Sequence, residues 1–142
     1  MHRRRWTVAV PICAILFLPG CRDVATEEVE VGYEPATVEE IKGSDLSRVV
    51  LEEDAAQRIG LDTVPTTGRR DGRTVVPESA IWVDVNGDEW VYTNPEALVF
   101  VRAQVVVTRY DDGLAYLSEG PAPGTEVASV GVAELIGSEF GI

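Results

Sequence analysis

Sulfur and imidazole groups, the side chains best suited to covalent chemistry, are scarce in this chain. His2 is the single histidine, and Cys13 and Cys21 are the two cysteines. Of these three residues, Cys21 alone lies beyond the first twenty positions. Its thiol directly follows the small residue Gly20, and the chemistry open to it is covalent modification at sulfur.

The residues before Cys21 have the layout of a secretory signal. Arg3, Arg4 and Arg5 precede an apolar run that extends from residue 8 to residue 18. The sequence Leu18-Pro19-Gly20-Cys21 resembles the lipobox of bacterial lipoproteins. This resemblance implies cleavage before Cys21, lipidation of Cys21, and a protein anchored to a membrane of the cell envelope on its extracytoplasmic side.

Two other interpretations of this segment stay open. A plain secretory signal would leave Cys21 as a free thiol. An uncleaved anchor would cross the membrane, but a spanning helix needs roughly 20 apolar residues, and the run here is shorter and contains Pro11.

Removal of residues 1–20 would leave a strongly acidic chain. Nine Lys and Arg residues would remain against 24 Asp and Glu. Nucleic acid is therefore excluded as a partner, because phosphate binding requires a basic surface. With no histidine and no second cysteine, the mature chain has no imidazole base, no disulfide and no His/Cys metal site. We predict no catalytic residue, no cofactor and no enzymatic activity.

The other candidate groups have simpler structural interpretations. Lys42 is the single lysine. Neither Ser79 nor Ser118 has a candidate general base that could activate its hydroxyl as a nucleophile. Residues 84–89 (Asp-Val-Asn-Gly-Asp-Glu) have the composition of a calcium loop. They lack the required Gly at the sixth position and Glu at the twelfth, so a hairpin turn is expected there.

Basic and aromatic residues each form one cluster. The basic cluster, Arg69, Arg70 and Arg73, could contact anionic headgroups, but a solvated turn is the expected interpretation. Trp82, Trp90 and Tyr92 could form an exposed contact patch; aromatic residues of a small sheet more often lie in the core, and we expect that here.

The chain divides into three predicted parts. Residues 1–20 are a lipoprotein signal peptide, residues 21–45 an acidic flexible tether, and residues 46–142 a β domain. The tether assignment follows from seven acidic residues between positions 23 and 40 and few apolar ones. Such a segment buries too little surface to offset its loss of conformational entropy.

Strand and turn signals dominate the β domain. A strand at 48–52 and a short helix at 53–59, ended by Gly60, are followed by strands near 75–77, 81–85, 89–93, 99–108, 114–117 and 126–130. The tail at 131–142 is expected to form one helical turn. The predicted fold class is mainly β: a small antiparallel β-roll or barrel with one short helix.

The hairpin at Asn86-Gly87 has two possible registers. A two-residue loop would pair Val83 with Trp90. A three-residue loop with a bulge would instead pair Trp82 with Tyr92.

The order of these segments resembles the HlyD-like periplasmic adaptors, or membrane fusion proteins, of efflux pumps. The similar segments are Val49–Pro65, Val76–Ile81, Trp90–Tyr92, Phe100–Val107 and Gly120–Gly131. They correspond to the membrane-proximal β portion of an adaptor, and no long heptad pattern for its helical hairpin is present. The resemblance implies a non-enzymatic, lipid-anchored envelope protein that docks to an inner-membrane transporter permease or to copies of itself. The alternative is an envelope lipoprotein that binds a small ligand or a cation.

Overall fold

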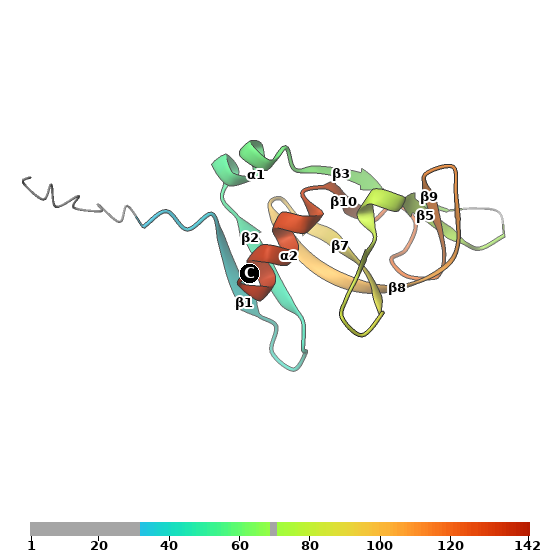
Figure 1. Cartoon of the computed structure of the whole chain (residues 1–142), viewed down its shortest axis with the longest axis horizontal. Helices are drawn as coiled ribbons and strands as arrows, with labels where there is room; N and C mark the ends of the chain where they lie inside the picture. The colour runs from blue at the N-terminus through green and yellow to red at the C-terminus, as the bar shows by residue number, and fades with distance from the viewer. Residues whose placement is uncertain (1–31, 69–70) are drawn as a thin grey trace, which may run out of the picture. The chain divides into compact units, whose positions relative to one another are not determined.

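The computed structural model describes residues 32–68 and 71–142, so the predicted signal peptide and Cys21 lie outside the described residues. The described chain is mainly β-structure, as the sequence predicts, and forms a nearly closed, antiparallel, barrel-like sheet with two helices (Figure 1). The elements in chain order are β1 (Ala36–Glu40), β2 (Ser47–Leu51), α1 (Glu53–Ile59), β3 (Asp62–Pro65), β4 (Thr67–Gly68), β5 (Thr74–Pro77), the 3-10 turn η1 (Glu78–Ala80), β6 (Trp82–Val83), β7 (Glu89–Glu96), β8 (Val99–Asp111), β9 (Leu114–Glu119), β10 (Glu126–Val130) and α2 (Val132–Phe140).

One short stretch of chain forms both ends of the main strand order. That order is β3-β10-β7-β8-β9-β5-β4, and β3 and β4 are consecutive in the sequence. Thr66 lies between them and is buried. Its hydroxyl donates to the Ala122 carbonyl at 2.7 Å, and the Thr125 amide donates to that hydroxyl at 3.1 Å. Thr66 therefore holds β3 and β4 against the turn before β10.

Two hydrophobic clusters share the same strands. Val91 and Tyr92 are adjacent on β7, yet Val91 belongs to one cluster and Tyr92 to the other; Val127 and Ala128 on β10 divide in the same way. Successive side chains of a strand point to opposite faces, so β7 and β10 are buried on both faces and form a wall between the two clusters.

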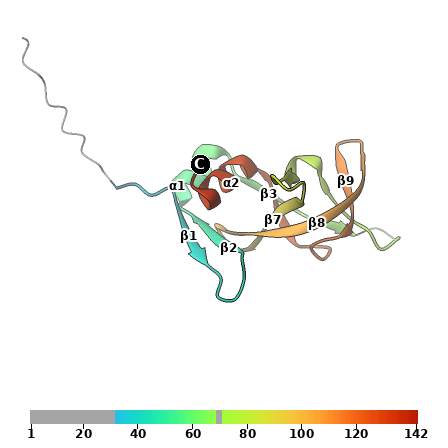
Figure 2. The same cartoon turned by 60° about the horizontal axis from the view of Figure 1, so that its bottom comes forward.

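We call the two sides of this wall the barrel half and the helix-capped half. The barrel half is the cluster Val76, Ala80, Val91, Val105, Ala115, Leu117 and Val127. The helix-capped half is the cluster Val49, Leu51, Ala56, Tyr92, Phe100, Ala128 and Leu135. β8 crosses from one to the other, pairing with β2 near its start and with β9 near its end (Figure 2).

Helix α2 covers the helix-capped half. It is longer than the single turn expected from the sequence, with nine residues, and it contacts β1 and β2 (Figure 1). Leu135 on this helix is fully buried. Gly131, which begins the helix, has a positive φ of 86°, and a Cβ there would lie 2.8 Å from the Leu61 side chain. A glycine is therefore required for the close turn from β10 into α2.

The predicted tether is wrong in its last part. Residues 36–40 form strand β1, which pairs antiparallel with β2 from Ala36 opposite Leu51 to Glu40 opposite Ser47. Backbone pairing along one edge is enough to form this strand, and Ala36 alone among its side chains packs on the core. The acidic Glu39 and Glu40 stay in solvent, so acidic composition was a poor guide here. The β-structure therefore includes residues from Ala36 on, which the prediction had assigned to the tether at 21–45.

Candidate functional site

The hairpin predicted at Asn86-Gly87 is present, but with neither of the two expected registers. Trp82 pairs with Trp90 and Val83 pairs with Glu89, and the Asp84 amide donates to the Asp88 carbonyl at 2.9 Å, so Val85–Gly87 form the turn. The Asp84 side chain supports this turn. Its Oδ1 accepts hydrogen bonds from the Asn86 amide at 2.8 Å and the Asp88 amide at 3.0 Å.

The Asp84 carboxylate also joins this loop to the strand that follows. Its Oδ2 accepts a hydrogen bond from the Trp90 indole nitrogen at 3.2 Å. Loss of hydration is the largest single effect and raises the pKa of Asp84, but the hydrogen bonds from Asp88, Asn86 and Trp90 together outweigh it and hold this pKa below its usual range. Asp84 is therefore an ionised structural group.

An apolar cleft of about 430 Å³ lies between this loop and the carboxyl end of α2. Its apolar lining is formed by Trp82, Val83, Val85, Ile136, Phe140 and Ile142. Four of these side chains are also strongly exposed: Val83 at 57%, Phe140 at 47%, Ile142 at 90%, and Val85 completely. Large apolar side chains from two distant parts of the sequence thus gather around one opening.

Trp82, which lines the cleft, packs against three other aromatic rings. The Trp82 ring lies 6.3 Å from that of Trp90 and 6.0 Å from that of Tyr92, and Phe140 meets its edge at 6.1 Å. The prediction that these aromatics are core residues is correct for Tyr92, which is fully buried, whereas both tryptophans are only half-buried. The Trp82 indole nitrogen is buried and has no hydrogen-bond partner among the described residues.

A buried ion pair supports the cleft from behind. Arg102 Nε lies 3.2 Å from Glu139 Oε1, and the two side chains are only 15% and 3% exposed. The Tyr92 hydroxyl donates to the other Glu139 oxygen at 2.6 Å. Burial is the larger cause and the contact with Glu139 the smaller one, and together they raise the pKa of Tyr92 far above its ordinary value. The Tyr92 hydroxyl therefore stays protonated and acts as a hydrogen-bond donor.

Arg102 extends this network to the cleft wall. Its guanidinium lies 4.8 Å from the centre of the Trp90 ring and 5.3 Å from that of Phe140. Its Nη2 donates to the Asp45 carbonyl at 3.0 Å. Because one side chain holds strand β7, helix α2 and the loop before β2, the wall of the cleft is a preformed surface.

Sequence reasoning did not single out Glu139. The available signal was its spacing: Glu139 continues the helical stripe of Val132, Leu135 and Ile136, and an acid at an apolar position is a sign of a buried partner. Arg102 was placed on a strand, but nothing local to it indicated a partner 37 positions away.

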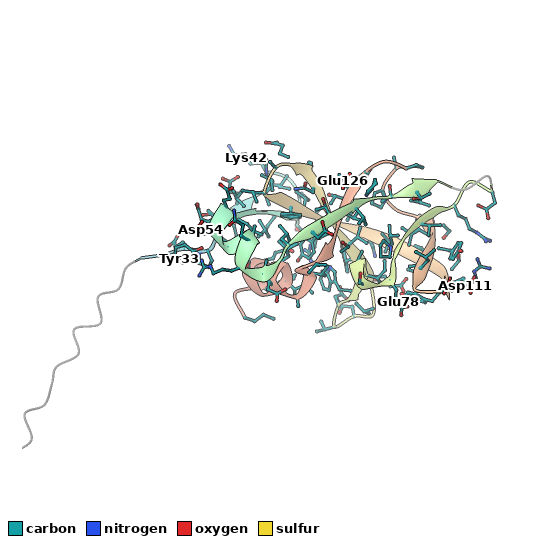
Figure 3. All side chains as sticks on the ribbon, turned by 90° about the horizontal axis from the view of Figure 1, so that it is seen from above. Tyr33, Lys42, Asp54, Glu78, Asp111 and Glu126 are labelled. Carbon is teal, nitrogen blue, oxygen red and sulfur yellow. The ribbon has the colours of Figure 1, made fainter. Side chains whose placement is uncertain are left out.

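The structure does not bring the other sequence candidates together. Lys42 is exposed in the loop after β1 (Figure 3). Ser79 is exposed in η1, and the Ser118 hydroxyl contacts the Val106 carbonyl at 3.4 Å. Arg73 pairs with Asp71 at 3.6 Å, while Arg69 and Arg70 lie outside the described residues.

Within residues 32–68 and 71–142, no group of three His, Cys, Asp or Glu side chains is placed to hold a metal ion. None of the helices in this described part is long and apolar enough to cross a membrane. Comparisons of the chain with protein-family models, with curated proteins and with solved structures find no match. Any function must therefore be argued from the residues themselves.

Proposed function

We propose that this protein is a non-enzymatic lipoprotein of the bacterial cell envelope whose β domain docks onto a membrane partner. Cys21 carries the lipid, and the partner is an inner-membrane transporter permease or further copies of this chain. The lipobox-like sequence at residues 18–21 and the similarity of the segments between residues 47 and 142 to efflux-pump adaptors support this proposal.

The observation that carries the docking proposal is the apolar rim of the cleft. Val83, Val85, Phe140 and Ile142 expose large apolar surface on a chain with a net charge of −12. Scattered exposed apolar residues need no explanation, but a gathered group on an otherwise charged protein is typical of a contact site. The group also surrounds a hollow, which allows a partner side chain to be buried.

The rigid wall behind the rim favours binding. Ordering side chains at an interface costs about 0.5–1.5 kcal/mol for each flexible side chain. Here Phe140 is already held by Arg102 and Trp82. A partner therefore meets a surface whose central elements are ordered before contact.

A second candidate function is binding of a small apolar ligand in the same cleft. Its volume of about 430 Å³ is within the usual range for ligand sites. Native mass spectrometry of the purified full chain separates the two functions: a co-purified small molecule that Trp82→Phe loses supports ligand binding.

The docking proposal is tested by a crosslinked pull-down from membranes. The native chain is compared with Cys21→Ser, and co-purification of a permease or of a second copy that depends on Cys21 is the expected result. Recovery of neither component from either chain would contradict docking. Mass spectrometry of the mature N-terminus tests the anchor separately, and an unmodified Cys21 thiol would contradict lipidation.

A further inference from the structure

Strand β1 offers a second surface, whose groove shares only Ile142 with the lining of the cleft. β1 pairs with β2 along one edge, and no other strand of the described residues pairs with its second edge. An unpaired edge presents amide and carbonyl groups that can extend a sheet by one further strand.

The register determines which groups of β1 point outward. The Glu52 amide donates to the Pro35 carbonyl at 3.0 Å, so these two residues form a hydrogen-bonded pair. Such pairs alternate with non-hydrogen-bonded pairs in an antiparallel ladder. Ala36 and Leu51 are therefore a non-hydrogen-bonded pair, and the Leu51 amide indeed donates away from β1, to the Leu98 carbonyl at 2.9 Å.

By the same alternation, the backbone groups of Ala36, Val38 and Glu40 all point away from β2. These three residues also direct their side chains to the face of the sheet that carries the buried residues Val49 and Leu51. The free backbone groups and the core-side face of β1 therefore belong to the same residues.

A groove of about 630 Å³ lies beside this edge. It is bounded by Pro35 and Ala36 at the start of β1, by Ile59 of α1, and by Gly137 and Ser138 of α2. The two α2 residues are small, which leaves room above Ala36. A strand added to β1 would direct the side chain beside Ala36 toward this groove, and a small apolar side chain would fit it.

The charge around the edge selects the partner. Glu34, Glu39 and Glu40 lie on or next to β1, and Glu134 lines the groove. Arg48 lies opposite Glu39 on β2, but its guanidinium forms an ion pair with Glu96 at 3.0 Å and so does not neutralise Glu39. Pairing β1 with β1 of a second copy would bring these acids together, which is unfavourable. Glu39 directs its side chain to the face opposite the groove, so a partner strand whose Lys or Arg side chains lie on that face would complement it.

We propose that β1 is a strand-addition site for an extended segment of a partner protein in which small apolar and basic residues alternate. Main-chain hydrogen bonds to Ala36, Val38 and Glu40 supply the binding, and the groove and the carboxylates supply the selectivity. This site rests neither on the lipid nor on the cleft, so it stands or falls apart from the docking function.

The test is binding of two synthetic peptides to the full chain in detergent. The probe is acetyl-(Val-Lys)3-amide, and its matched counterpart is acetyl-(Val-Glu)3-amide. We expect the lysine peptide alone to bind, with slowed hydrogen exchange at the amides of Ala36, Val38 and Glu40. Val38→Pro removes an outward amide and spares the β1–β2 ladder, and it should weaken binding by about fivefold or more.

Charge is tested separately from the backbone. Glu39→Lys should weaken binding of the lysine peptide by about threefold and improve binding of the glutamate peptide. Glu119→Lys makes the same charge change on β9, which does not pair with β1, and should leave both affinities unchanged. Unchanged binding in Val38→Pro, equal binding of the two peptides, or slow exchange at Val38 and Glu40 without any peptide would each overturn the proposal.

Discussion

The two halves of this domain differ in how their cores are closed. The barrel half is closed by strands, with Thr66 joining the two ends of the main strand order. The helix-capped half is closed by α2, which packs Leu135 into the core and holds Glu139 against Arg102. Closure by strands leaves little room for a partner. Closure by a helix leaves a strand edge at one side and a cleft at the other.

Both candidate surfaces therefore lie on the helix-capped half. The cleft uses the carboxyl end of α2, and the groove beside β1 is lined by α2 residues from Ala133 to Ser138 and by Gly141 and Ile142 after the helix. Strands β7 and β10 contribute alternate residues to both cores, so the wall that they form belongs to both halves. The halves differ in the elements that cover this wall, which are strands on one side and helix α2 on the other. Helix α2 is therefore the element to change in order to separate binding from folding.

The largest expected effect is loss of the buried carboxylate on α2. Glu139→Ala leaves Arg102 unpaired at low exposure, and we expect a loss of about 3 kcal/mol in the free energy of unfolding. Urea denaturation measures it, and amide exchange should show faster opening of α2 than of the barrel half. The control is Glu134→Ala, an exposed acid on the same helix that should change little. Equal destabilisation by the two variants would contradict the assigned role of the ion pair.

A smaller effect is expected at the closure of the barrel half. Thr66→Val keeps the shape of the side chain but removes the hydroxyl that bonds to Ala122 and Thr125. We expect a loss of about 1–2 kcal/mol by urea denaturation, with faster exchange in β10 and unchanged protection of α2. Thr67→Val, the exposed neighbour, is the matched control. Fast exchange throughout the domain would show that the two halves open together.

The smallest effect is a dependence of stability on alkaline pH. Burial, reinforced by Glu139, raises the pKa of Tyr92, and burial with a hydrogen bond to Glu89 raises the pKa of Tyr110 to about 12. Unfolded tyrosine loses its proton near pH 10. Above that pH the folded chain therefore binds more protons than the unfolded chain does. The free energy of unfolding should fall as the pH rises from about 10 toward 12.

Tyr92→Phe separates the two tyrosines. It should cost about 1 kcal/mol at neutral pH because Glu139 loses a donor, and it should flatten the alkaline decline measured by urea denaturation at pH 9 and pH 11. Tyr110→Phe, on the exposed end of β8 near Asp111 (Figure 3), should flatten it less. A wild-type stability that is constant across this range would contradict the burial of the Tyr92 hydroxyl as a protonated donor.

Much of the fold could be predicted because it follows local rules. The helix at Glu53–Ile59 and the strand at Glu126–Val130 have the predicted bounds, since Gly60 and the flanking turns mark their ends locally. The hairpin register could not be predicted, because it depends on which amides the Asp84 side chain captures. Strand β1 was missed because its stability comes from pairing with β2 rather than from its own apolar residues.

The candidate site was harder to predict than the fold. Trp82, Trp90 and Tyr92 were recognised as a group, but their division between core and cleft is set by α2, whose Phe140 and Glu139 lie far along the chain. A tail containing Gly137 and Ser138 has weak helical propensity. The helical spacing of Leu135 and Glu139 indicates a helix, but its length depends on the partners that these side chains find in the sheet.

The central claim is that the rim of the cleft contacts a membrane partner, and photo-crosslinking tests it most directly. Benzoylphenylalanine is placed at Val85, which is fully exposed at the rim, or at Tyr110, which is exposed at the far end of β8. After irradiation of membranes that carry the full chain, position 85 should crosslink to a permease or a second copy, and position 110 should not. No crosslinked protein at position 85, or the same products at both positions, would contradict the claim.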